Sequence, residues 1–165
     1  MNLTGKSALI SGATSGIGKE TAIALAKMGA HVCLIGRNPE KTESLVKAII
    51  KGHPEAKISC LLADLSSQNE IHKLADHFKA EHASLDILVN NAGALLAKRD
   101  ESVDGFEYTW ALNHLNYFLL TTLLQDQLRA APAARVVSVA SAAHMRGRMH
   151  WDDLQLKDSY SYAGW

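Results

Sequence analysis

The 165-residue sequence predicts an α/β fold in which helices cover both faces of a doubly wound parallel sheet. Three observations lead to this prediction. Short runs of aliphatic and β-branched residues alternate with longer stretches of helical spacing. The short runs are apolar throughout, as in strands buried on both faces of a parallel sheet. Most glycine-rich or polar segments follow these runs directly, and the carboxyl ends of parallel strands are where such sheets bind ligands.

Five strands are expected, and they cover residues 8–10, 31–35, 58–62, 85–89 and 135–139. The first helix is expected to begin near Lys19. Asn38 before a proline predicts the start of the second helix, because asparagine is a good N-cap and proline suits the first helical position. Gly52 marks its end. Ser67 with Glu70 three residues later forms a capping-box pattern for the third helix.

Composition excludes several classes of function. The hydrophobic share of 47% and the charged share of 21% are those of an ordinary soluble protein. Seventeen basic residues balance seventeen acidic ones, so no basic patch predicts a nucleic-acid partner or an anionic membrane surface. Neither a signal sequence nor an apolar run long enough to span a membrane is present. We therefore expect one domain over residues 1–165 and a cytoplasmic location.

Cysteines and histidines do not predict a metal site or a disulfide. Cys33 and Cys60 fall in apolar strands, which predicts buried free thiols. His72, His77 and His82 are spaced by five, and each turns about 140° from the last around a helix, so they cannot converge on one ion. We expect no metal.

A glycine-rich turn joins the first strand to the first helix. Glycines there let the backbone approach a pyrophosphate closely, while the helix N-terminus supplies free N–H groups. The pattern therefore predicts a dinucleotide site with a Rossmann-type fold. The candidate cofactor-binding residues in this turn are Gly12, Thr14, Ser15, Gly16, Ile17 and Gly18.

The end of the second strand bears on the choice of dinucleotide. A site for NAD places an acidic residue near this point, whereas an arginine accommodates the 2′-phosphate of NADP. Gly36 carries no carboxylate, and Arg37 is a planar, permanently charged donor followed by Asn38. We expect NADP(H), contacted by Arg37 and Asn38. The alternative is a surface arginine paired with Glu40, which would leave the preference open.

The glycine spacing, Gly-x-x-x-Gly-x-Gly, resembles that of the short-chain dehydrogenase/reductase family, in particular its retinol-dehydrogenase-like branch. The resemblance runs from about Gly5 to the end of the chain. It implies an NADP(H)-dependent oxidoreductase that interconverts a lipophilic alcohol and a carbonyl. It also implies that Asp64 and Leu65 frame the adenine, although Asp64 could instead cap a helix. Further cofactor contacts implied by the resemblance are Asn91, Ala92 and Gly93.

Two catalytic residues follow from the same resemblance. A long helix is expected from about Asp104 to Arg129. Within it, Asn113 would hold a water of the proton relay, and Ser141 after the fifth strand would bind the substrate oxygen. Two positions depart from the family pattern, since Asn116 stands where glycine is common and Ser138 where asparagine is common. In such proteins part of this helix also forms a homo-oligomer interface.

The acid/base pair of the family, Tyr-x-x-x-Lys, is absent from the chain. Tyr108, Tyr117 and Tyr160 have Leu, Thr and Gly four residues on, and Tyr162 would need a residue 166. The ending KDSYSYAGW resembles a cut just before the catalytic tyrosine. We therefore expect a fold incomplete on its C-terminal side, an exposed fifth strand and crippled catalysis.

Two other functions were weighed against this one. A catalytically inactive short product that binds dinucleotide or a partner subunit fits the missing pair. A methyltransferase on a similar sheet fits less well, because Arg37 stands where such proteins want an acidic residue.

Overall fold

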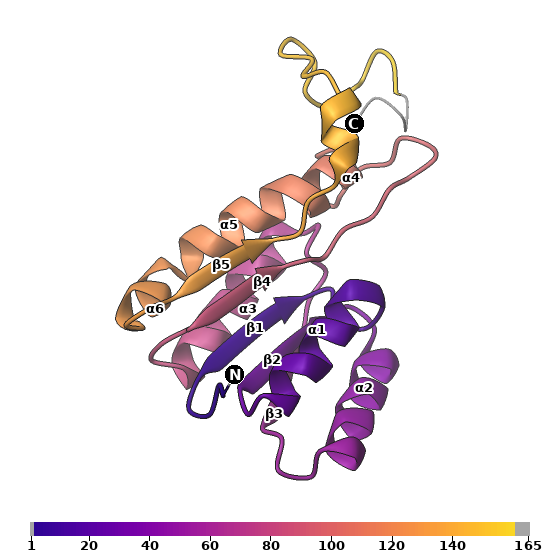
Figure 1. Ribbon diagram of the computed structural model, residues 1–165. Coiled ribbons are helices and arrows are strands. Elements are labelled where there is room, and N and C mark those ends of the chain that lie inside the picture. The colour runs from indigo at the N-terminus through magenta and orange to yellow at the C-terminus, as the bar shows by residue number, and fades with distance from the viewer. Residues whose placement is uncertain (1, 161–165) are drawn as a thin grey trace.

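The computed structural model describes residues 2–160. Its strands are β1 (Ser7–Ser11), β2 (His31–Gly36), β3 (Ile58–Leu62), β4 (Ile87–Asn90) and β5 (Arg135–Ser138). They form one sheet in the order β3-β2-β1-β4-β5, and all four pairings are parallel (Figure 1). The predicted doubly wound parallel sheet is confirmed.

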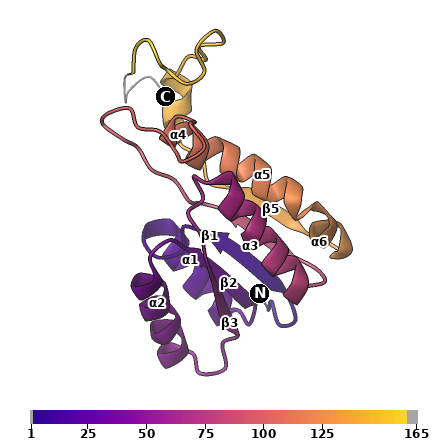
Figure 2. The ribbon, with the colours of Figure 1, turned by 180° about the vertical axis from the view of Figure 1, so that it is seen from behind.

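Helices lie on both faces of the sheet. They are α1 (Gly16–Lys27), α2 (Pro39–Gly52), α3 (Gln68–Glu81), α4 (Tyr108–Trp110), α5 (Asn116–Leu123) and α6 (Gln125–Ala130), with a π-helical turn η1 (Ala111–Leu115) and a 3₁₀ turn η2 (Ala142–Arg146). Figure 1 shows α1 and α2 on one face, and Figure 2 shows α3 and α5 on the other.

Successive strand residues supply the two cores, because side chains alternate between the faces of a strand. Leu9 of β1 belongs to the cluster under α3 and α5, which contains Phe78 and Leu120. The next residue, Ile10, belongs to the cluster under α1 and α2, which contains Leu45.

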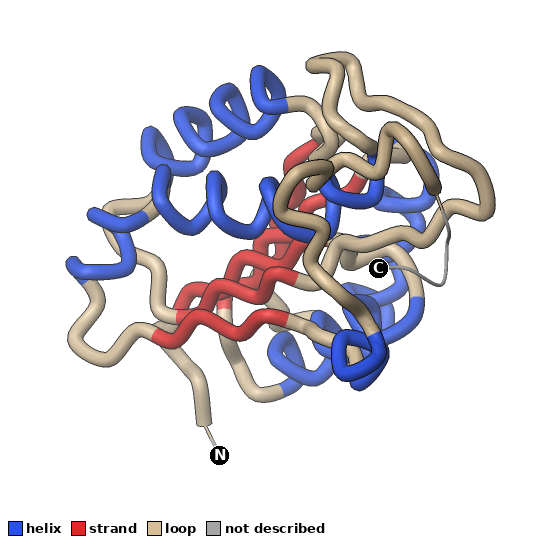
Figure 3. The backbone as a smooth tube through the Cα atoms, turned by 90° about the horizontal axis from the view of Figure 1, so that it is seen from above, coloured by secondary structure: helices blue, strands red, loops and turns tan. Residues whose placement is uncertain are grey.

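The order of the strands reverses beside β1. This strand pairs with β2 on one side and with β4 on the other, so that Ile10 lies opposite both Leu34 and Val89. Chain segments that leave β1 and β4 therefore diverge at the same edge of the sheet. Figure 3 shows the sheet from above, with helices on both of its faces. Such a switch point is the general ligand site of an open α/β sheet.

The helix starts follow the capping signals in the sequence. The Asn38 side chain accepts a hydrogen bond from the backbone N–H of Lys41 at 2.8 Å, and Pro39 follows it. Ser67 Oγ accepts from the Glu70 N–H at 3.4 Å. The Glu70 carboxylate turns to the backbone N–H of Asp64, so only half of the predicted capping box forms.

The long helix predicted from Asp104 to Arg129 is wrong as a continuous element. Gly105 has a φ of +77° and lies in a turn. Helical structure begins only after Glu107, whose buried carboxylate accepts hydrogen bonds from two backbone N–H groups of the first turn, at 2.9 and 2.6 Å. A break at Leu124, with φ −100° and ψ 12°, separates α5 from α6.

The two cysteines differ in their surroundings. Cys33 is buried, and burial raises the pKa of its thiol to about 11, which keeps it protonated. Cys60 is exposed, so the expectation of two buried thiols is wrong for it. It lies on β3, an edge strand, and the cluster under α2 includes Leu34 of β2 but not Cys60.

The fifth strand lies at the other edge and is exposed along its length, as expected. Val136 and Val137 keep 45% and 49% of their surface accessible. Among residues 2–160, no helix is both long and apolar enough to cross a membrane. Residues 161–165, which form most of the ending KDSYSYAGW, lie outside the described residues.

Candidate functional site

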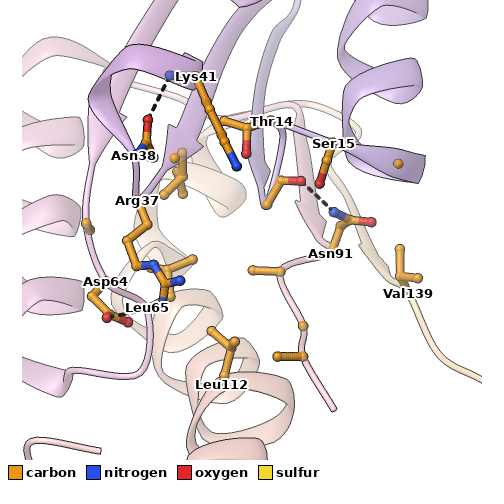
Figure 4. Close-up of a pocket in the computed structure, with 18 of the residues that line it drawn as sticks. Thr14, Ser15, Arg37, Asn38, Lys41, Asp64, Leu65, Asn91, Leu112 and Val139 are labelled. Carbon is orange, nitrogen blue, oxygen red and sulfur yellow. Dashed lines mark hydrogen bonds and ion pairs between the residues drawn. The ribbon is translucent and has the colours of Figure 1, made fainter. Parts of the chain in front are cut away.

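A cavity of about 620 Å³ lies at the carboxyl edge of the sheet, over the switch point. Its walls come from segments far apart in the sequence, as Figure 4 shows. Every predicted cofactor residue except Gly18 lines it, namely Gly12, Thr14, Ser15, Gly16, Ile17, Arg37, Asn38, Asp64, Leu65, Asn91, Ala92 and Gly93. A volume of this size is that of an ordinary small-molecule site.

The glycine turn is shaped by close contact with the segment after β4. A Cβ on Gly12, which has a φ of +63°, would lie 2.7 Å from the Cα of Ala92. A Cβ on Gly18 would lie 2.4 Å from Asn91 Nδ2, so Gly18 serves packing behind the cavity wall. Gly16, with a φ of +52°, has open space where its Cβ would point. The turn therefore keeps its backbone accessible, as a cradle for a pyrophosphate requires.

Asn91 holds this turn in place. Its Nδ2 donates to the backbone carbonyls of Ser11 and Gly12, at 3.0 and 3.1 Å. In return, Ser11 Oγ accepts from the backbone N–H groups of Asn91 and Ala92, at 2.9 and 3.0 Å. Asn91 lines the cavity, but its amide nitrogen is engaged with the protein backbone.

At the end of β2, Gly36 is required by packing. A Cβ there would lie 2.0 Å from the hydroxyl oxygen of Thr42. Arg37 does not pair with Glu40. Its guanidinium donates to the Tyr108 hydroxyl at 2.7 Å and lies 3.7 Å from a carboxylate oxygen of Asp64.

Asp64 is not the cap of α3, because Ser67 takes that position, and the predicted contact of Asp64 with an adenine stays a prediction. Its carboxylate accepts hydrogen bonds from the backbone N–H and the hydroxyl of Ser66, at 2.9 and 2.7 Å, which shapes the turn before α3. It also lines the cavity beside Leu65 (Figure 4). A turn-forming aspartate is therefore compatible with a place at the adenine end of a dinucleotide site.

Asn113 lies in the π-helical turn η1. Its Oδ1 accepts from the backbone N–H of Ala94 at 2.9 Å, and its Nδ2 donates to the carbonyl of the same residue at 2.8 Å. This pair of bonds fixes the segment after β4 just beyond Gly93. The predicted role of Asn113 in holding a water stays a prediction.

Ser141 follows β5 and begins the 3₁₀ turn η2. Its hydroxyl oxygen accepts a hydrogen bond from the backbone N–H of Ala143 at 3.1 Å, and the residue is exposed. The hydroxyl hydrogen keeps the freedom to point toward a substrate oxygen.

A second cavity of about 370 Å³ lies between α4 and the segment after η2. Most of its lining is apolar, with Trp110, Met149, Leu154 and Leu156 among the lining residues, next to His144 and His150. The segment that forms it is held to the loop after β4, because Arg99 Nε donates to the Gln155 carbonyl at 3.0 Å. The Tyr160 hydroxyl donates to the Leu96 carbonyl at 2.8 Å.

Sequence reasoning missed several residues of the first cavity, among them Lys41, Tyr108, Leu112 and Val139. Lys41 had a signal, because a cation in the first turn of a helix opposes the helix dipole. Tyr108 had none, since its approach to Arg37 depends on how the chain after β4 brings α4 to the end of β2. In the described part of the chain, no group of three His, Cys, Asp or Glu side chains could hold a metal.

The parallel sheet, the glycine turn and the cavity over the switch point define a dinucleotide-binding α/β protein. A family model described as short chain dehydrogenase matches residues 6–152. The chain belongs to the short-chain dehydrogenase/reductase family, whose members are oxidoreductases that use nicotinamide dinucleotides.

Named relatives agree with this assignment. Human retinol dehydrogenase 12 is 41% identical over 161 residues, which are 98% of this chain and 51% of that protein. Human polyprenol dehydrogenase is 39% identical over 158 residues, 93% of this chain and 48% of that protein. The chain thus spans about half the length of these curated relatives.

Solved structures extend the comparison. The NADP active-site complex of Pseudomonas aeruginosa RhlG superposes with a TM-score of 0.75 at 32% identity, covering 86% of this chain and 57% of that one. A protein described as a short chain dehydrogenase from Escherichia coli CFT073, complexed with NADPH, has a TM-score of 0.78 at 26% identity, with coverage of 93% and 65%.

Proposed function

We propose that this chain binds NADP(H) and belongs to an enzyme that interconverts a lipophilic alcohol and a carbonyl compound. The observation that carries the proposal is the cavity at the switch point. Its lining joins the open backbone of the glycine turn to two cations, Arg37 and Lys41, at the end of β2. The carboxylate that NAD-binding sites use near this point is absent at Gly36.

The residues present fit such a cofactor. Gly12 and Gly18 could carry no Cβ without collision, and Gly16 presents open space to the cavity. The pyrophosphate would lie against Thr14, Ser15 and Gly16, at the N-terminus of α1. The adenosine half would lie between Arg37 and Leu65. When bound, the dinucleotide supplies or accepts the hydride, and the residues of this chain hold and orient it.

The substrate class rests on the segment that follows β5, where Ser141 lies outside the lining of both cavities. Ser141 would bind the substrate oxygen through its hydroxyl. In the same turn η2, the backbone N–H of His144 donates to the Ser141 carbonyl, and His144 lines the second cavity. The apolar lining of that cavity suits an apolar substrate body. Relatives named retinol dehydrogenase and polyprenol dehydrogenase support the same class. The cytoplasmic location stays a prediction.

Isothermal titration of the 165-residue chain with NADPH and with NADH tests the cofactor. We expect saturable binding with NADPH favoured about tenfold or more, because charged hydrogen bonds to a phosphate contribute about 1.5–3 kcal/mol. NADPH at 100 times its Kd should also stabilise the fold by about 2.7 kcal/mol. Absence of binding, or equal affinities, would contradict the proposal.

The reaction is tested on the protein isolated from its native source. We expect NADPH consumption with retinaldehyde or long-chain aldehydes. The 165-residue chain alone should be slower by about a hundred- to ten-thousand-fold, because it lacks the acid/base pair. An isolated protein that binds NADPH but reduces none of these aldehydes would favour the inactive, dinucleotide-binding alternative.

A further inference from the structure

A third cavity, of about 10 Å³, lies where η1 and the start of α5 pack against the turn before α3. These helices share the face of the sheet shown in Figure 2. Most of its lining is apolar, and the polar side chains in that lining are Ser66, Gln68 and Asn116. Leu65 lines both this cavity and the first one, so the two share a wall. A space of this size holds about one water molecule.

Asn116 is buried with only half of its amide satisfied. The residue is 0% exposed, and its Nδ2 donates to the Leu112 carbonyl at 3.2 Å. Its Oδ1 is also buried and has no hydrogen-bond partner among residues 2–160. A buried carbonyl oxygen without a donor costs free energy, and native proteins rarely leave one in that state. The Asn116 oxygen therefore needs a donor.

The neighbouring polar groups favour a water as that donor. Ser66 is buried, and both its backbone N–H and its hydroxyl already donate to Asp64, at 2.9 and 2.7 Å. The hydroxyl oxygen of Ser66 still has a lone pair that accepts. One water can therefore donate to Asn116 Oδ1 and to Ser66 Oγ together. The Gln68 side chain carries N–H donors for the water oxygen, which gives the two to four bonds that a buried water makes.

We propose that Asn116 binds a single internal water molecule in this cavity, and that the water joins η1 to the turn before α3. The backbone N–H of Asn116 donates to the Ala111 carbonyl, five residues back, so Asn116 closes the π-helical turn that carries Asn113. The water ties this turn to Ser66, next to the shared wall at Leu65. A glycine, which is common at this position in the family, has no side chain to bind it.

This inference goes beyond the proposed function, because no dinucleotide takes part in it. It is tested first on the wild-type 165-residue chain without NADPH. High-resolution crystallography should show one ordered water at about 2.8 Å from Asn116 Oδ1. Nuclear Overhauser spectroscopy in solution should show transfer from a long-lived water to the Asn116 side-chain amide hydrogens.

Asn116→Leu removes the acceptor and keeps the branched shape of the side chain. It should lose both the ordered water and, at the Leu115 methyl groups, any transfer from water. The matched control is Asn69→Leu, the same chemical change at an exposed position of α3, which should keep both signals. Circular dichroism verifies that each variant is folded, and the wild-type measurements decide the question where a variant is not.

Three results would overturn the inference. One is a dry cavity in which Ser66 or Gln68 donates directly to Asn116 Oδ1. Another is an ordered water in the crystal without transfer in solution, since that water exchanges freely and is not held. The third is a water that persists in Asn116→Leu. Calorimetry with NADPH is independent of all three, so a chain that holds the water but binds no NADPH refutes only the proposed function.

Discussion

Single residues around the glycine turn show why a motif and a ligand contact are different things. Gly18 belongs to the sequence motif, yet it does not line the cavity. Its missing side chain makes room for Asn91, whose amide holds the carbonyls of Ser11 and Gly12. The glycine therefore acts on the cofactor site through the shape of the turn.

At this scale we predict that Gly18→Ala damages both stability and binding. The new methyl group would lie 2.4 Å from both Asn91 Nδ2 and the Gly12 carbonyl oxygen, so the turn must shift. We expect a loss of about 1–3 kcal/mol in the free energy of unfolding, as for other overpacked sites, and weaker NADPH binding. Chemical denaturation and calorimetry measure the two effects.

Gly52→Ala is the control for Gly18→Ala. Gly52 ends α2 and has nothing within 4 Å of where a Cβ would lie, so the substitution should be neutral or slightly stabilising. Equal effects of the two alanines would refute the packing role of Gly18.

Among the elements, the broken helix after β4 is the informative one. Its π-helical turn η1 points Asn113 at the backbone of Ala94, and Asn116 Nδ2 donates back to the Leu112 carbonyl at 3.2 Å. Single π-helical turns are rare and are found frequently at functional sites. Here the turn ties α5 to the segment that forms the cavity floor after β4.

We predict that Asn113→Ala loosens this segment. Two hydrogen bonds to Ala94 are lost, and each contributes about 0.5–1.5 kcal/mol. Hydrogen exchange at the Ala94 amide should therefore accelerate by about tenfold or more, whereas the amides of β1 should be unaffected. Asn69→Ala, on the exposed side of α3, is the matched control. Unchanged exchange at Ala94 would show that the segment is held by other contacts.

For the whole molecule, two titratable groups at the amino edge of the sheet couple stability to pH. Burial pushes the pKa of Asp86 upward, but hydrogen bonds from Lys6 and Ser7 outweigh it and hold that pKa below its ordinary value. Burial, together with nearby His31, lowers the pKa of His82, which stacks on Phe78. The fold therefore favours the neutral form of His82 and the charged form of Asp86.

The sign follows from linkage. Both pKa values are lower in the folded chain, so the stability that each group contributes is present above its unfolded pKa and lost as the pH falls. We expect one decline that begins near pH 6.5, from His82, and a second below about pH 4, from Asp86. Chemical denaturation at a series of pH values measures the profile.

Two variants separate the steps. His82→Gln should flatten the upper decline. Asp86→Asn should lower neutral-pH stability by about 1–3 kcal/mol, because Lys6 and Ser7 lose a charged acceptor, and the difference from wild type should vanish in acid. A profile that either variant leaves unaltered would contradict the assignment of that step.

Much of the architecture could be predicted from the sequence. The apolar runs located all five strands to within two residues at either end, because strand formation and burial both depend on short segments. Asn38 and Ser67 located the starts of α2 and α3 because a cap needs only the next few residues. The helix start after Glu107 and the break at Leu124 were both missed, since regular apolar spacing continues through these positions.

The division between sequence and structure is clearest in the cofactor cavity. Sequence alone determined the fold class, the family and most of the strand-end segments that line the cavity, because these depend on local patterns at strand ends. Only the tertiary structure decided that Arg37 bonds to Tyr108 and that Lys41 extends into the cavity with no partner among residues 2–160. These relations join residues about 70 positions apart or depend on side-chain direction. The physical reason is that strand order and helix packing, not neighbouring residues, set which charges meet.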